Sequence, residues 1–155
     1  MSAESLKEYL EKMGVDAKFY KFEKHTMTAE AAAKRLGVSL EKIIKSIIFI
    51  DDSDSPVLAI VTGDKKISEK KLAMACGAKR IRIATPDEVK KLTGYDVGGV
   101  PPVGHKVSIR TFIDKKVMSL DKVIGGGGEI NVVLEISPAE IKNLTNAEVK
   151  DISEP

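Results

Sequence analysis

The chain has 155 residues, 43% of them hydrophobic and 5% aromatic, which predicts one domain with a mainly aliphatic core. Its formal net charge of +2 does not commit it to nucleic acid, and its single cysteine excludes an internal disulfide and a CxxC metal site. The N-terminus shows no long apolar segment, so we expect a cytoplasmic protein with neither a signal peptide nor a transmembrane helix.

In the first half of the chain, apolar spacing and capping residues predict alternating helices and strands. The expected helices cover Ser5–Met13, Thr28–Gly37 and Ser39–Ile44, and the expected strands cover Ala17–Phe22, Ile47–Ile50 and Val57–Thr62. Thr28 is the expected N-cap of the second helix, and Gly37 ends it. A polar turn at residues 51–56 separates the last two strands and predicts a hairpin.

The second half predicts shorter elements. Expected helices cover Ser68–Cys76, Thr85–Thr93 and a segment from Ser137, and expected strands cover Arg80–Ala84, Val107–Ile113, Lys116–Ser119, Lys122–Ile124, Asn131–Ile136 and Glu148–Ile152. A turn at residues 114–115 separates two of these strands. Because hairpins are mixed with helices, we expect an α+β fold with a central, mainly antiparallel or mixed sheet flanked by helices.

Lys45 is the first candidate for a functional residue. It stands near the head of the apolar run Ile43–Ile50, which has the character of a core strand. A lysine is costly to bury, so it tends to be kept where an anion or a carbonyl group requires its charge. Together with glycines that allow a ligand to approach the backbone, Lys45 predicts a pocket that binds an anionic group.

Two glycine-rich segments, Gly94–Gly104 and Gly125–Gly128, are the second candidate feature. The four consecutive glycines lie between strand-like runs, which favours a wall where a ligand meets backbone N–H groups over a flexible linker. The first segment mixes glycine with proline and either presents amides and carbonyls in fixed directions or is a structural turn. Neither segment is a P-loop or a dinucleotide-binding fingerprint, because no Gly-Lys-Ser/Thr closes them and the second leads into a strand.

The other reactive side chains give weaker signals. Neither histidine has metal-ligand spacing, and Cys76 on an apolar helix face is expected to be a buried spectator, so we expect no metal and no cofactor. His25 is expected at the surface or in a capping role, whereas His105 closes the glycine–proline loop and stays a candidate. No Gly-x-Ser-x-Gly elbow supports a Ser-His-Asp triad.

From Gly63 to Lys91, nine lysines and arginines outnumber four acidic residues. This excess fits either a face that contacts a phosphate backbone or a solvated helical surface, and the sequence leaves both open.

Four segments together resemble a known family. They are Thr28–Ala32 with Leu36–Val38, Ile44–Ile47, Gly94–His105, and Gly125–Gly128 followed by Leu134–Pro138. In this order and spacing the chain resembles the YbaK/ProX family of aminoacyl-tRNA deacylases, the superfamily that includes the editing insertion domain of bacterial prolyl-tRNA synthetase. The resemblance covers about Phe19–Ile141 and implies a single domain, residues 1–155, with a partly barrel-like sheet.

The resemblance also implies a function, the hydrolysis of the ester between a wrong amino acid and the end of its tRNA. It gives Lys45 the catalytic role of holding the phosphate or carbonyl end of the substrate, while the attacking water is oriented by substrate and backbone. The expected substrate-binding residues are Phe22, Thr28, Ser46, Gly98, Gly99, Val100, Pro101, Pro102, Gly104, His105, Gly125, Gly126, Gly127 and Gly128.

The chain departs from the pattern of some members. A serine and an aspartate that they carry correspond here to Gly125 or Gly126 and to Asn131 or Val133, and a tyrosine corresponds to Phe22. These positions adjust the amino-acid pocket, so the resemblance leaves Ala, Cys, Ser and Thr open as the amino acid removed.

The leading hypothesis is therefore a trans-editing deacylase for tRNA mischarged with a small amino acid, with tRNA and an aminoacyl-tRNA synthetase as partners. Pre-aimed N–H groups and a cation can stabilise the oxyanion of ester hydrolysis, and a second hydrolytic site is useful where synthetases discriminate poorly. The alternatives are a non-catalytic module that binds a tRNA end or nucleotide, and a small phosphate-binding protein.

Overall fold

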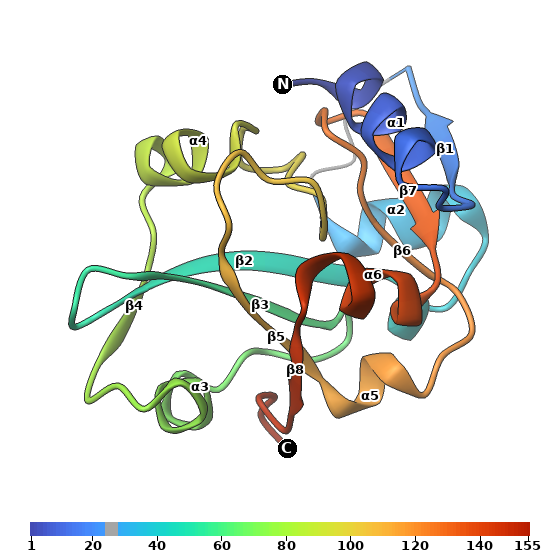
Figure 1. Ribbon diagram of the computed structural model, residues 1–155. Coiled ribbons are helices and arrows are strands. Elements are labelled where there is room, and N and C mark those ends of the chain that lie inside the picture. Colours follow the sequence, from blue (N-terminus) through green and yellow to red (C-terminus); the bar gives the residue numbers. More distant parts are fainter. Residues whose placement is uncertain (24–27) are drawn as a thin grey trace.

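The computed structural model describes residues 1–23 and 28–155 (Figure 1), so the expectation for His25 lies outside the described residues. The helices are α1 (Ala3–Lys12), α2 (Ala29–Leu36), the 3-10 turn η1 (Leu40–Lys42), α3 (Glu69–Cys76), α4 (Pro86–Thr93), α5 (Lys115–Met118) and α6 (Pro138–Thr145). The strands are β1 (Lys18–Lys21), β2 (Ile44–Asp51), β3 (Pro56–Thr62), β4 (Ile81–Ile83), β5 (Arg110–Asp114), β6 (Val123–Gly126), β7 (Val132–Ile136) and β8 (Glu148–Lys150).

The helix ends follow the capping chemistry of the sequence. The hydroxyl of Thr28 accepts a hydrogen bond from the N–H of Ala31, and Gly37 ends α2 in the left-handed conformation. At the start of α4, Thr85 and Glu88 form a reciprocal capping box around a proline in the first turn. These caps confirm the predicted starts of both helices.

The strands are divided between two sheets, in the orders β4-β2-β3-β5-β8 and β1-β7-β6, rather than gathered in one. The hairpin β2–β3 is antiparallel, as predicted, but β3–β5 and β5–β8 are parallel, so the larger sheet is mixed. An isolated parallel bridge between Ile43 and Ile124 joins the sheets at the start of β2. The fold is thus α+β with a mixed sheet, as expected.

The two faces of the β2–β3 hairpin contact different helices. On one face Ile48 and Ile60 pack in the cluster that holds Val89 of α4, and on the other Phe49 and Val61 pack with Leu72 of α3. Figure 1 shows α3 and α4 on opposite sides of this hairpin. A third cluster places α2 against Ile43 of one sheet and Ile124 of the other, so α2 covers the junction of the sheets.

Three local predictions were wrong. Residues 116–119, predicted as a strand, lie mainly in α5, because the carboxylate of Asp114 caps the N–H of Lys116 and starts a helical turn. The helix predicted over Ser39–Ile44 shortens to η1, and Ser39 makes no capping bond. Strand β5 begins at Arg110 rather than at Val107.

In the part of the chain that the structure describes, none of the helices combines the length and the apolar character that crossing a bilayer requires.

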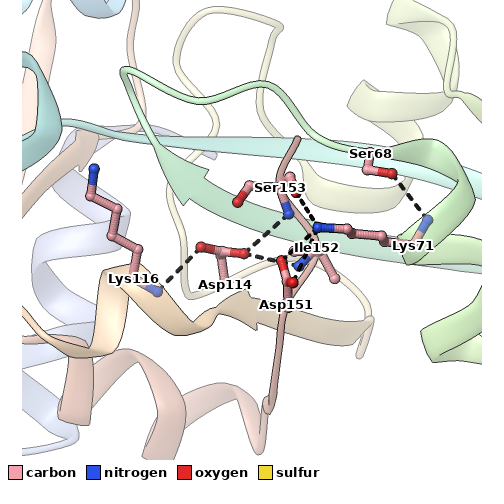
Figure 2. Close-up of polar contacts among 7 residues, drawn as sticks. All are labelled: Ser68, Lys71, Asp114, Lys116, Asp151, Ile152 and Ser153. Atoms are coloured by element: carbon pink, nitrogen blue, oxygen red, sulfur yellow. Dashed lines mark hydrogen bonds and ion pairs between the residues drawn. The ribbon is translucent and has the colours of Figure 1, made fainter. Parts of the chain in front are cut away.

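Asp114 also fastens the C-terminal segment to the sheet (Figure 2). Its side chain is buried, and Oδ1 accepts hydrogen bonds from the N–H groups of Ile152 and Ser153 at 2.9 and 3.1 Å. Oδ2 accepts from the N–H of Lys116 at 3.2 Å. Lys71 reaches the same segment, since its ammonium donates to the carbonyl of Ser153 at 2.9 Å.

We expect Asp114→Ala to lower the free energy of unfolding by about 2–4 kcal/mol, because it leaves the amides of Ile152 and Ser153 without their acceptor. Asp151→Ala is the matched control: this carboxylate is exposed and, among the described residues, pairs with Lys71 alone, so its removal should cost less than about 1 kcal/mol. Urea denaturation measures both values. Equal effects of the two substitutions would contradict the role assigned to Asp114.

Candidate functional site

A cavity of about 460 Å³ lies along one edge of β2. Its volume is in the range of small-molecule sites. The lining comes from α2 (Thr28, Ala29, Ala32), from β2 and its approach (Ile43, Ile44, Lys45, Ser46, Ile47, Ile48), from the β4–α4 region (Ile83, Ala84, Pro86, Val89), from a loop (Val97, Gly98, Val100) and from β6 and β7 (Ile124, Gly125, Gly126, Val132, Val133).

The cavity exists because β2 lacks a neighbour over half of its length. Strand β3 pairs with β2 from Ile44 to Ile50, but β4 pairs only with residues 49–51. The carbonyl of Ile48 accepts the N–H of Ala84 at 2.9 Å, the last bond on that side. Since alternate residues of a strand turn their backbone groups to the same side, the amide and carbonyl of Ser46 face the open edge.

Lys45 is half-buried on this open stretch and is the single charged residue of the described lining. Because side chains alternate along a strand, Lys45 and Ser46 point to opposite faces of the sheet. Both line the cavity, because the cavity runs along the edge of β2. Within residues 1–23 and 28–155 its ammonium group has no ion-pair or hydrogen-bond partner. An unpaired, partly desolvated cation is available to a ligand that carries negative charge.

The hydroxyl of Ser46 is the second unsatisfied polar group of the lining. Its Oγ exposes less than 1 Å² and has no hydrogen-bond partner among the described residues. Buried hydroxyl groups nearly always have a partner, so this one is suited to a ligand or a water molecule.

Two helices begin at the cavity. Thr28 and Ala29 at the start of α2 and Pro86 at the start of α4 belong to its lining. Helix N-termini carry partial positive charge and add to the field of Lys45. The cavity is therefore electropositive and suits a group on which negative charge develops.

The glycines predicted to bind substrate divide into two groups. Gly98, Gly125 and Gly126 line the cavity, together with Val100. A Cβ on Gly126 would overlap the carbonyl oxygen of Val100, so the two backbones meet at this wall. For these residues the structure brings together what the sequence singled out.

Gly99, Gly127 and Gly128 lie outside the lining and have another reason to be glycine. A Cβ on Gly99 would lie 2.9 Å from the backbone of Glu129, and one on Gly128 would lie 2.9 Å from the nitrogen of Ala3. The N–H of Gly128 donates to the carbonyl of Gly99 at 2.9 Å. Close packing of three backbone segments, not a ligand, requires small residues here.

Pro101, Pro102, Gly104 and His105 also lie outside the lining. The Nε2–H of His105 donates to the carbonyl of Pro101 at 2.7 Å and closes the loop. Gly104 has φ +76° and lies against Leu6 of α1. This loop supports the cavity wall formed by Gly98 and Val100 on the side away from the cavity.

Phe22 packs in the cluster of α2 rather than in the cavity. Its carbonyl accepts from Nδ2 of Asn131 at 2.9 Å, and the guanidinium of Arg35 lies 5.7 Å from the ring centroid. Phe22 thus ties β1 to the loop before β7.

Burial lowers the pKa of His105, against the opposing effect of its bond to Pro101. A histidine whose pKa is lower in the folded than in the unfolded state contributes stability that is complete above the unfolded value, about 6.5, and is lost as the pH falls below it. We expect wild type to lose more stability than His105→Gln between about pH 7.5 and about pH 5, as followed by urea denaturation.

His105→Gln should also retain the hydrolytic activity that the resemblance implies within about tenfold, because the imidazole does not line the cavity. Parallel pH profiles of the two proteins, or loss of activity in a stable variant, would contradict this assignment.

The basic stretch from Gly63 to Lys91 does not form one free surface. Lys71 pairs with Asp151, Arg82 with Glu88, and Lys90 is 3.6 Å from Asp96. Arg82, together with the backbone N–H of Thr85, lowers the pKa of Glu88 to about 2. Three of the nine cations of this stretch thus have acidic partners among the described residues, and both interpretations of the stretch stay open. Cys76 is half-buried, and its thiol donates to the carbonyl of Ala73.

The chemistry open to this cavity is narrow. Its described lining holds no carboxylate, imidazole or thiol, so it offers no side-chain general base. Across the described residues there is also no group of three or more His, Cys, Asp or Glu that could hold a metal ion. What it offers is a cation, backbone groups and an apolar wall, which suit an oxygen that gains negative charge.

Sequence reasoning missed the apolar wall. Ile43, Ile83, Ala84, Val89 and Ile124 line the cavity from four separate segments of the chain. Each looks like an ordinary core residue in the sequence, and only the pairing of β2 with β4 and the crossing of β6 bring them together.

Comparisons with known proteins give a consistent result. A family model described as an aminoacyl-tRNA editing domain matches residues 23–144. The "Putative Cys-tRNA(Pro)/Cys-tRNA(Cys) deacylase EbsC" of Enterococcus faecalis is 29% identical over 127 residues, 82% of this chain and 77% of that protein. A proline–tRNA ligase of Lactobacillus helveticus is 37% identical over 108 residues, which are 70% of this chain but 19% of the ligase.

Among solved structures, the "Crystal structure of a putative trans-editing enzyme for prolyl tRNA synthetase" superposes with a TM-score of 0.90 at 32% identity. The superposition covers 99% of this chain and 97% of that one. The similarity thus extends over nearly the whole chain.

Proposed function

The chain belongs to the aminoacyl-tRNA editing domain family, and from that membership we propose that it hydrolyses tRNA mischarged with a small amino acid at the cavity along β2. As a member of this family it is an aminoacyl-tRNA deacylase. The proposal concerns its substrate, its partners and the residues that act.

The observation that carries the proposal is the position of Lys45. It is the single cation of the described lining, it shares that lining with Gly98, Gly125 and Gly126, and it has no partner among the described residues. In hydrolysis of the aminoacyl ester, water adds to the carbonyl carbon and the carbonyl oxygen gains negative charge. Lys45 and backbone N–H groups stabilise this oxyanion.

The reaction then completes without a side-chain base. The ester C–O bond breaks, one proton of the added water goes to the leaving ribose oxygen and the other to solvent, and the amino acid is released as a carboxylate. Because aminoacyl esters are already reactive, a site that stabilises the oxyanion and orients the water can hydrolyse them without a side-chain base.

The walls of the cavity support a small amino acid and a nucleoside end. Alanine and branched aliphatic side chains form most of the lining, and they favour small or apolar side chains over charged ones. Ile83 and Val97, 58% and 48% exposed, give the mouth of the cavity an apolar rim against which a terminal adenosine can rest. Alanine, cysteine, serine and threonine all fit this description.

The proposed partners are mischarged tRNA and a prolyl- or other aminoacyl-tRNA synthetase, in the cytoplasm. The trans-editing structure overlaps with this chain over nearly its whole length, whereas the matching segment is a small part of the proline–tRNA ligase. This contrast supports an enzyme that acts in trans.

A panel of tRNAs charged with alanine, cysteine, serine, threonine and proline tests the proposal. We expect the wild-type protein to release one or two of the small amino acids at a rate at least about tenfold above spontaneous hydrolysis. Binding of tRNA without release of any amino acid would contradict the proposal and would favour a non-catalytic module that holds the tRNA end.

A further inference from the structure

The formal charge of the described cavity lining is positive only. Lys45 is the single charged residue of its described lining, which contains no aspartate or glutamate. The sequence of residues 24–27, which precede the lining residue Thr28, contains no acidic residue either. A site that recognises an ammonium group by charge places a carboxylate beside it, and this lining has none.

The acidic side chains near lining residues in the chain, among them Glu30 and Asp87, lie outside the described lining, and three of them have partners elsewhere. Asp96, next to Val97 of the rim, is 77% exposed and lies 3.6 Å from the ammonium of Lys90. Glu129, which follows the glycine run, accepts the N–H of Ala3 at 3.1 Å. Glu88 of α4 is paired with Arg82. None of the three lines the cavity.

This charge distribution has a consequence for an aminoacyl ester. Its α-nitrogen is one carbon atom from the carbonyl group that Lys45 is proposed to contact. A cation this close to Lys45, without a carboxylate, is disfavoured, and an α-amino group loses its proton readily near neutral pH.

The polar groups that remain in the lining suit uncharged partners. The backbone carbonyl of Ser46 faces the open edge of β2, and the Oγ of Ser46 has no partner among the described residues. An amine, an amide N–H and an alcohol can each donate to these acceptors, so none of them needs a charge to bind.

We propose that the site takes the acyl ester with an uncharged α-substituent, so that α-hydroxyacyl and N-acylated esters on tRNA are substrates as well as aminoacyl esters. This inference rests on the proposed function, because it concerns the substrate class of the same cavity. It extends the activity beyond mischarged amino acids to any small acyl ester on the tRNA end that lacks a positive charge.

The test uses the aminoacyl-tRNA that the panel identifies and two neutral forms made from it. Nitrous acid converts its α-amino group to a hydroxyl group of nearly the same size, and acetic anhydride acetylates it. Each rate with enzyme is divided by the spontaneous rate of the same ester, because the α-ammonium group itself activates the ester. Lys45→Ala, run in parallel, should lose activity on all three esters if they share the cavity.

We expect the normalised rate with the α-hydroxyacyl ester to fall by less than about thirtyfold, since loss of a charge-assisted hydrogen bond would cost about that factor or more. The acetylated ester should remain a substrate within the same limit. A larger fall for the α-hydroxyacyl ester, with the aminoacyl ester still cleaved, would overturn this inference and leave the proposed function standing. If no ester is cleaved, both fail.

Discussion

Lys45→Ala is expected to lower kcat/KM for deacylation by about 10²- to 10³-fold, the effect of removing one preorganised group that stabilises an oxyanion. Lys45 is half-buried and its ammonium group has no partner among the described residues, so its removal breaks no hydrogen bond or ion pair there. The melting temperature should therefore change by less than about 4 °C. Single-turnover deacylation and thermal unfolding measure the two quantities.

Lys70→Ala is the matched control for charge. Lys70 is exposed on α3, outside the cavity lining and without a partner among the described residues, so its loss changes the net charge equally. We expect deacylation by this variant to stay within about threefold of wild type. Equal losses in both variants would mean that Lys45 acts only through the overall charge, and unchanged activity of Lys45→Ala would remove it from the reaction.

Gly126→Ala is the second large effect. A methyl group at this position would overlap the backbone carbonyl of Val100, which cannot move without displacing the loop or β6. We expect the free energy of unfolding to fall by about 1–3 kcal/mol. Deacylation should fall by about 10²-fold, because the displaced wall misplaces the substrate.

Gly125→Ala provides the comparison at the neighbouring residue of the same wall. Its added Cβ would lie 3.0 and 3.1 Å from Cγ1 and Cδ1 of Ile44, a side chain that needs to shift by only a few tenths of an ångström. The cost in unfolding free energy should be less than about 1 kcal/mol. The account of the wall would be wrong if Gly125→Ala proved the more damaging substitution in urea denaturation and activity.

Local chemistry explains which parts of the fold were predictable. The starts of α2 and α4 and their glycine ends depend on side-chain caps and on left-handed residues, which act over a single turn. The β2–β3 hairpin likewise forms over a short turn, where the carboxylate of Asp51 accepts the N–H groups of Ser53 and Ser55. Such features are set by residues a few positions apart.

Long-range contacts explain the failures. The Asp114 carboxylate, which caps the helical turn at Lys116, is itself held in place by the N–H groups of Ile152 and Ser153, which lie 38 and 39 residues further along the chain. The parallel pairing of β5 with β3 and β8 likewise depends on elements remote in sequence. A pattern of apolar residues in one segment carries no information about these partners.

The candidate site shows the same division. Lys45 and the glycines are unusual at their positions, so the sequence singled them out, yet only Gly98, Gly125 and Gly126 of the glycines reach the cavity lining. Gly99, Gly127 and Gly128 serve the packing of backbone on backbone. In both cases glycine allows another group to come close to the backbone. The sequence alone does not distinguish a ligand from another segment of the protein as that group.

The central claim is that the acyl end of tRNA binds in the cavity along β2. Titration of ¹⁵N-labelled protein with a non-hydrolysable analogue, an adenosine that carries the amino acid through a 3′-amide bond, tests it most directly. We predict that the largest amide shifts occur at Ser46, Gly98 and Gly126. Shifts confined to the separate hollow around Lys91, Gly94 and Lys106 would contradict the claim.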